Sequence, residues 1–129
     1  MKKGVKMDIT RMVRNLRRRK NSQKIGMIVS HLGIVRGTSL DGSKVTSIQV
    51  EYDHEAIENI IQDIKRSKGI FDVQVQTKEG RLKVGDEILG VVVAGDIREN
   101  VFPALIKTVN RIKADASKKK ETLSKRRPK

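Results

Sequence analysis

A chain of 129 residues without cysteine has the length of one domain, and it offers no disulfide, thiolate metal ligand or thiol nucleophile. It contains no apolar run long enough to span a membrane, and its basic start lacks the apolar part of a secretory signal, so we expect a soluble, cytoplasmic protein. The net charge of +14 is uneven: residues 1–24 hold ten basic residues and one acidic, residues 107–129 ten and two, and the middle nine and twelve. Basic ends attract polyanions, but two phenylalanines, one tyrosine and no tryptophan disfavour a base-stacking surface.

The first third of the chain predicts a helix, a strand and a loop. Asp8 is placed to cap a short helix, whose apolar face is formed by Ile9, Met12, Val13 and Leu16. Residues 25–35 are rich in β-branched side chains, which is typical of a strand. The segment 37–43 contains two glycines and several small polar residues, so we expect a flexible loop there.

The middle of the chain predicts a strand, a helix and three further strands. Residues 45–52 have strand character, and Asp53 can cap a helix that Gly69 ends. Residues 71–76 alternate apolar and polar, as in a half-buried strand. Residues 82–84 are expected to form a two-residue hairpin with 88–94 through Gly85 and Asp86. The 88–94 strand is apolar on both faces and therefore central, and Gly90 predicts a bulge or a close backbone approach.

The last helix carries an apolar stripe and two lysines of interest. The stripe consists of Val101, Phe102, Leu105, Ile106, Val109 and Ile112. If the helix continued past Lys113, Lys120 would lie on nearly the same face, roughly 10 Å along the axis, and the two ammonium groups would form a pocket for an anion. The alternative is that residues 118–129 form a basic, disordered tail after a single domain of residues 1–117. The element order as a whole predicts an α+β domain with helices packed on a sheet.

Three basic residues are candidates for binding an anion. Arg36 follows a strand and precedes the glycine-bearing loop, where a rigid scaffold can present a guanidinium to phosphate or carboxylate. Arg98 stands at the start of the last helix, close to free backbone N–H groups. Lys113 follows the apolar stripe, so we expect partial desolvation and a lowered pKa. For each of them an ordinary solvated surface charge is the alternative.

The two histidines do not predict a metal site. His31 and His54 have no neighbouring ligand cluster, so a zinc site would lack its usual donors, and we expect no bound metal or cofactor. His31 lies on an apolar strand and is expected to be a satisfied core residue. The chain also has no nucleophile elbow, Walker-type phosphate loop or dinucleotide fingerprint.

Several motifs together resemble the large, catalytic subunit of molybdopterin synthase. They are Gly33-Ile34-Val35-Arg36, Val50-Glu51-Tyr52, the segment from Gly80 to Glu87, Arg98 with Phe102, and Arg111-Ile112-Lys113 followed by Lys120. The resemblance covers roughly residues 8–121 and depends on the order and spacing of all the motifs. It implies an α/β-hammerhead-like mixed sheet with packed helices and a small additional antiparallel sheet.

The resemblance also implies a function and partners. Enzymes of this family transfer sulfur from the C-terminal Gly-Gly thiocarboxylate of a small ubiquitin-like subunit to cyclic pyranopterin monophosphate, which forms the dithiolene of molybdopterin. The large subunit is expected to be a homodimer within a heterotetramer. Lys113 matches the family's catalytic lysine and Lys120 its second pocket lysine, while Arg36 and Arg98 match its anion-binding arginines. A chain without cysteine suits a reaction in which a partner delivers the sulfur.

The chain departs from the family pattern at several of these positions. Ile97 stands where the family usually has a histidine, and Ser117 where it usually has a proline. His31 replaces an aromatic residue, and Lys78 lies where a His-Arg pair usually precedes Gly80, so that Lys78 is a further candidate for binding substrate. These departures leave two hypotheses open. One is a synthase subunit with reduced or lost activity, and the other is a non-catalytic module whose basic ends bind nucleic acid or an acidic protein.

Overall fold

The computed structural model describes residues 7–123 of the chain. In this range the helices are α1 (Ile9–Arg17), α2 (His54–Lys65) and α3 (Arg98–Arg111), with a 3₁₀ turn η1 (Ser22–Lys24) and a π-helical turn η2 (Ile112–Ala116). The strands are β1 (Met27–Ile34), β2 (Val45–Tyr52), β3 (Ile70–Thr77), β4 (Gly80–Lys83), β5 (Glu87–Gly95) and β6 (Ser117–Leu123). None of the helices in residues 7–123 is long and apolar enough to cross a membrane.

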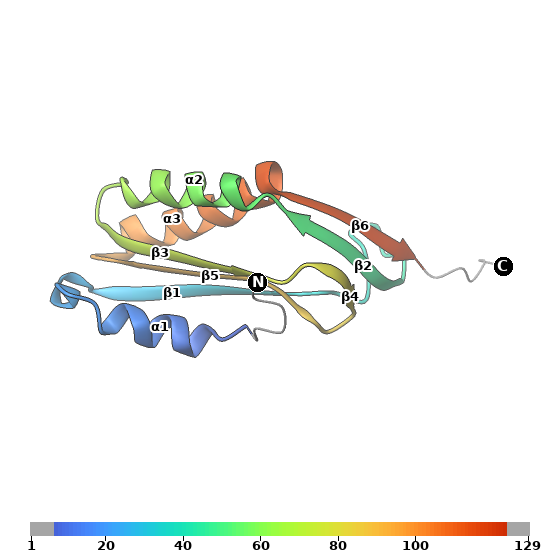
Figure 1. The fold of residues 1–129 in the computed structure, drawn as a ribbon, viewed down its shortest axis with the longest axis horizontal. Coiled ribbons are helices and arrows are strands. Elements are labelled where there is room, and N and C mark those ends of the chain that lie inside the picture. Colours follow the sequence, from blue (N-terminus) through green and yellow to red (C-terminus); the bar gives the residue numbers. More distant parts are fainter. Residues whose placement is uncertain (1–6, 124–129) are drawn as a thin grey trace.

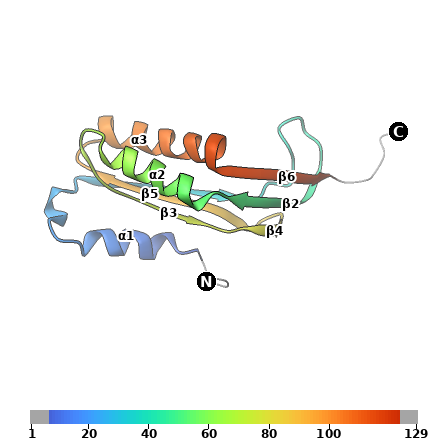
Figure 2. The same ribbon diagram turned by 45° about the horizontal axis from the view of Figure 1, so that its top comes forward.

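The first sheet has the strand order β1-β5-β3, and all of its pairs are antiparallel. Helices α2 and α3 cover one face, and α1 covers the other (Figures 1 and 2). Its central strand, β5, is fully buried from Val91 to Ala94. This confirms the prediction that the strand with two apolar faces is central and covered.

Helix α1 packs on the first sheet as its apolar spacing predicts. The Asp8 carboxylate caps it by accepting a hydrogen bond from the Arg11 N–H at 3.0 Å. Met12 and Leu16 are buried in a cluster with two residues of β5. A Cβ atom on Gly90 would lie 3.0 Å from the Ile9 side chain, so the glycine permits the close approach that the sequence suggested.

The second sheet, β4-β2-β6, shows that the predicted hairpin is wrong. The turn after β4 is tight, since the Asp86 N–H donates to the Lys83 carbonyl at 2.9 Å, but β4 pairs with β2, and β5 pairs with β1 and β3. Two backbone hydrogen bonds of 2.9 Å join Val35 to this turn, from the Gly85 N–H and to the Asp86 carbonyl. The turn is therefore held by the end of β1, and the strands on its two sides enter different sheets. The resulting fold, an α+β domain with a small additional antiparallel sheet, is the predicted class.

The chain after α3 differs most from the prediction. Helix α3 ends at Arg111, so Lys113 and Lys120 do not share a helix. Residues 117–123 form β6, which pairs along β2 and supplies the backbone partners that the edge of β2 needs. The expectation of a disordered tail is thus wrong for residues 118–123, and residues 124–129 lie outside the described range. The error has a physical reason: β6 is an edge strand whose lysines are exposed, so its sequence lacks apolar alternation.

Candidate functional site

Lys113 lies in η2, which follows α3 without a break. The two ends of this turn, Ile112 and Ala116, are buried, whereas Lys113 is exposed between them. The partial desolvation expected for Lys113 is therefore wrong. A π-helical turn is wider than an α-helical one and is common at functional sites. Here it presents the ammonium group to solvent between two buried anchors.

Two hydrogen bonds hold this turn in place. The Asp53 N–H, at the start of α2, donates to the Ala116 carbonyl at 2.8 Å. The Ser117 hydroxyl donates to the Lys113 carbonyl at 3.2 Å. The backbone that carries Lys113 is consequently fixed from α2, from β6 and from its own buried ends.

His31 is the residue that sequence reasoning misjudged most. It lies on β1 opposite Val91, and its Nε2 atom is buried without a hydrogen-bond partner among residues 7–123, so it is not the satisfied core residue that was expected. Burial lowers the pKa of its imidazole, and the positive charge of Lys113 lowers it further. Gly33 lies two residues along the same face, and a Cβ atom there would come within 3.3 Å of Nε2, a closeness that only the structure shows.

Arg36 is exposed directly after Val35, which is buried and tied to the turn between β4 and β5. The following loop, expected to be flexible, is closed by backbone and side-chain hydrogen bonds. The Asp41 carboxylate accepts hydrogen bonds from the Ser39 hydroxyl and from the Ser43 N–H, the latter at 2.9 Å. The Ser39 bond and the Ser43 bonds lower the pKa of Asp41 to about 2. The scaffold therefore presents Arg36 next to an ordered loop.

Lys120 and Lys78 lie on other parts of the fold. In β6 Lys120 pairs with Gln49, which in turn pairs with Arg81 of β4, so these three side chains share the outer face of the second sheet. Lys78 is exposed just after β3, at the edge of the first sheet opposite to β1. With strands about 4.8 Å apart, that places its backbone roughly 10 Å from β1.

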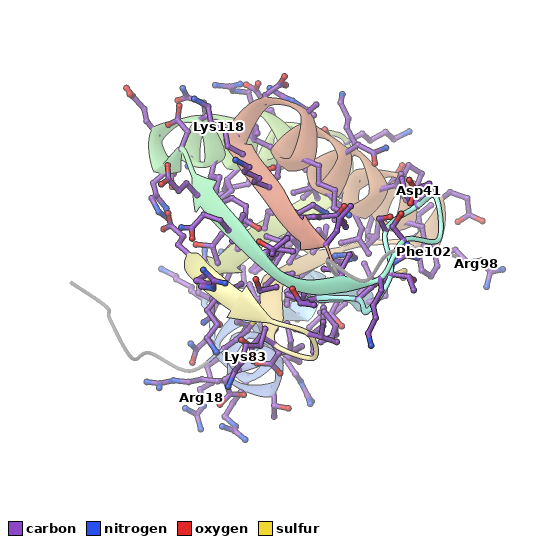
Figure 3. All side chains as sticks on the ribbon, turned by 90° about the vertical axis from the view of Figure 1, so that its right-hand side faces the viewer. Arg18, Asp41, Lys83, Arg98, Phe102 and Lys118 are labelled. Atoms are coloured by element: carbon purple, nitrogen blue, oxygen red, sulfur yellow. The ribbon has the colours of Figure 1, made fainter. Side chains whose placement is uncertain are left out.

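Arg98 is separated from Lys113 by the whole length of α3. Fifteen residues at about 1.5 Å each put the two backbones roughly 22 Å apart. Arg98 is exposed and pairs with Glu99 at 3.6 Å. Figure 3 shows Arg98 and Phe102 projecting from the side of α3 that faces away from α2. Within one chain, Arg98 and Lys113 therefore do not form one pocket.

The outer side of α3 is more apolar than the sequence suggested. Phe102 and Ile106, assigned to the buried stripe, are 49% and 60% exposed, and Ile97 at the start of the helix is 53% exposed. Ala104 and Thr108 are buried in their place. The buried face of α3 therefore includes Ala104 and Thr108, and Phe102 and Ile106 form a second apolar strip that is exposed to solvent.

The described residues contain no cluster of three or more His, Asp or Glu side chains that would suit a metal ion. The η2 turn itself carries one basic and one acidic side chain, Lys113 and Asp115, and both are exposed. Two shallow hollows lie elsewhere, one beside Lys68 and Lys107 and one beside Arg17 and Ser22.

Comparison with known proteins identifies the family to which this chain belongs. The chain matches the MoaE protein family over residues 4–115. It is 30% identical over 105 residues to the molybdopterin synthase catalytic subunit of Ralstonia nicotianae, which is 77% of this chain and 59% of that subunit. The chain therefore spans somewhat more than half the length of that relative.

Two solved structures share the fold. The molybdopterin cofactor biosynthesis protein E of Burkholderia multivorans is 30% identical, with a TM-score of 0.73 that covers 90% of this chain and 81% of that one. In the complex of subunits 1 and 2 of the molybdopterin-converting factor of Helicobacter pylori, one chain is 16% identical, with a TM-score of 0.66 that covers 94% of this chain and 86% of that one. At that identity the second match shows the fold alone. From the family match and the Burkholderia structure together, the chain belongs to the MoaE family.

Proposed function

We propose that this chain is the large subunit of a molybdopterin synthase and acts in molybdenum cofactor biosynthesis as a sulfurtransferase. In this proposal it transfers sulfur from the C-terminal thiocarboxylate of a small subunit to cyclic pyranopterin monophosphate. The observation that carries the proposal is the exposed Lys113 on its anchored turn, in a chain that belongs to the MoaE family. Because the sequence contains no cysteine, the sulfur must arrive on a partner.

Both proposed substrates carry negative charge, and the candidate residues carry positive charge. The thiocarboxylate is an anion, and negative charge develops on its acyl oxygen when water adds to that carbon to replace the sulfur, so a fixed ammonium at Lys113 would stabilise both. The guanidinium of Arg36 is suited to the substrate phosphate, since it can bind two oxygens at once. Lys78 and Lys120 are proposed to add to the positive potential that attracts both substrates.

The proposal also includes a homodimer, because one chain does not complete the site. Arg98 is roughly 22 Å along α3 from Lys113, so it would act on the same substrate only from a second copy. Phe102 and Ile106 beside it give a second copy an apolar surface to cover. The small subunit would then bind each copy, as a heterotetramer, in the cytoplasm.

The direct test of Lys113 is an assay of dithiolene product by mass spectrometry, with a thiocarboxylated small subunit and cyclic pyranopterin monophosphate. We expect Lys113→Ala to abolish product while leaving the oligomeric state unchanged. Lys107→Ala is the matched control, because Lys107 is exposed on α3 and should be dispensable. Undiminished product from Lys113→Ala would remove Lys113 from the mechanism.

A complementation experiment tests the contribution of a second copy. If Arg98 acts across the dimer, mixing the Lys113→Ala and Arg98→Ala chains under exchange conditions restores one intact site in each mixed dimer. About a quarter of wild-type activity should return, because half of the dimers are mixed and each has one working site of two. A mixture as inactive as its parts would place Arg98 outside the shared site.

A second candidate function, binding of nucleic acid through the basic ends, is favoured by one observation on α1. Arg11, Arg14, Arg17 and Arg18 are all exposed along its outer side. Such a surface would bind a phosphate backbone with an affinity that falls steeply with salt. Binding of duplex DNA that persists at about 0.15 M salt and disappears when these arginines become glutamine would support it, and no binding at that ionic strength would exclude it.

A further inference from the structure

The Nε2 atom of His31 is the unexplained polar group of this site. It is buried and has no hydrogen-bond partner among residues 7–123, although buried polar groups in proteins are nearly always paired. Such an orphan is a common mark of a group whose partner arrives with a ligand. The ring is held against Gly33, where the lack of a side chain leaves the space that it occupies.

The side chain of His31 lies on the face of the first sheet that α2 and α3 cover. Side chains alternate along a strand, so His31 shares a face with Val29, which packs in the cluster under α2 and α3. Helix α3 packs on β1 and leads directly into η2, which carries Lys113. His31 and Lys113 therefore lie on the same side of the first sheet, and the charge of Lys113 is close enough to lower the pKa of His31.

The electrostatic surroundings of His31 are simple. No other residue of β1 is titratable, and β5 contributes only Glu87, which lies near Ile34 at the far end of the pairing. Helix α1, whose sequence carries Arg11, Arg14 and Arg17, lies on the opposite face of the sheet (Figure 2). On the helix side Arg111 is engaged with Asp63 at 3.1 Å, and Asp115 is exposed. Lys113 is the charged group that acts on His31, and it disfavours the imidazolium.

We propose that His31 and Lys113 form an anion subsite in which His31 takes up one proton when the anion binds. This inference rests on the proposed function only in assuming that the site receives an anionic substrate group, either the small-subunit terminus or the substrate phosphate. A bound anion offsets the charge of Lys113 and gives the protonated Nε2 an acceptor. Proton uptake and anion binding must then favour each other equally, so the anion binds more tightly as the pH falls.

The test follows the two histidines by NMR, which is direct because the chain contains only His31 and His54. His54 is exposed and pairs with Glu79, so it serves as the internal control. The full chain is titrated between about pH 5 and 8, alone, with sulfate as the phosphate probe, and with N-acetyl-diglycine as the carboxylate probe; neither anion changes its charge there. We expect one of the two probes to raise the pKa of His31 and to leave His54 in place, and the probe that does so identifies the ligand class.

Two lysine variants test whether Lys113 couples the pKa of His31 to anion binding. Lys113→Met should raise the pKa of His31 in the free chain and abolish the response to the anion, and Lys107→Met should do neither. If the pKa of His31 rises by one unit on binding, the anion should bind about tenfold more tightly below both pKa values than above them. The proposal is overturned if both probes leave His31 unchanged, or if Lys113→Met responds like the wild type.

The outcome separates this inference from the proposed function. Product formation with no response of His31 to either probe overturns the subsite and leaves the synthase assignment intact. A proton-coupled anion site in a chain that forms no product supports the subsite and counts against catalysis. His31→Phe, which keeps a ring in the same space, should bind the effective probe with an affinity that no longer depends on pH.

Discussion

The two sheets of this molecule are covered very differently. The first has helices on both faces, and its central strand is fully buried from Val91 to Ala94. The second has one apolar face with a small cluster that includes Ile48, Val50 and Leu82, and its other face carries polar and basic residues. The first sheet therefore supplies most of the buried core, whereas the second supplies exposed surface.

The largest effect on stability is expected from truncating a side chain in the larger core. Ile112→Ala removes a fully buried side chain where α3 passes into η2. We expect the free energy of unfolding to fall by about 2–5 kcal/mol, because a cavity remains among α2, α3 and β5. Urea unfolding followed by circular dichroism measures this, and a loss below about 1 kcal/mol would show that this core is less tightly packed than described.

The same truncation in the second sheet should cost less. Leu82→Ala leaves a cavity in a cluster of only five buried residues, where neighbours can relax, so we expect a loss of about 2 kcal/mol. Amide hydrogen exchange should accelerate in β2, β4 and β6 while β5 stays protected. Equal acceleration in both sheets would mean that they unfold as a single unit.

The ion pairs that join β3 to the segment after α1 and to α2 give a smaller effect. Asp72 is buried on β3, forms an ion pair with Arg19, and lies 3.4 Å from the Lys65 ammonium. Asp72→Ala should cost about 1–2 kcal/mol, discounted because both cations are partly exposed and regain water. Asp72→Asn is the control, since it keeps the shape and removes the charge. A stability loss that is the same at low and high salt would argue against an ionic contribution.

The smallest effect is expected at the surface link between α2 and α3. The Arg66 side chain, and then Arg111, lower the pKa of the Asp63 carboxyl. A lowered carboxyl pKa contributes stability above its unfolded value that is lost as the pH falls through the folded one, so Asp63→Asn should weaken the chain slightly near neutral pH and not in acid. Denaturation midpoints at about pH 7 and pH 3 measure this, and an equal loss at both would contradict it.

Much of the first sheet was predictable, because its signals are local. Apolar periodicity located α2 and β5, and Asp8 and Asp53 cap helices as expected. The predictions from sequence were wrong where the structure depends on pairing between segments that are distant in the chain. Nothing in the residues around Gly85 shows that β4 pairs in another sheet than β5, and the exposed lysines of β6 conceal a strand whose partner, β2, lies 65 to 78 residues earlier. For the site, family resemblance selected Lys113, but the orphaned atom of His31 appears only when the strand is packed under α3.

The short connection from α3 to β6 has a consequence for how mutations would be tolerated. There is no loop in which an inserted or deleted residue could be absorbed, so a change of length there would shift β6 by one position along β2 and turn its side chains over. Lys118 and Lys120 now face outward, opposite Glu51 and Gln49. Because Lys119 stands between them, a slip in either direction would leave one lysine on the outer face in place of two, next to Ser117 or Glu121, so the positive charge of this edge depends on the register of β6.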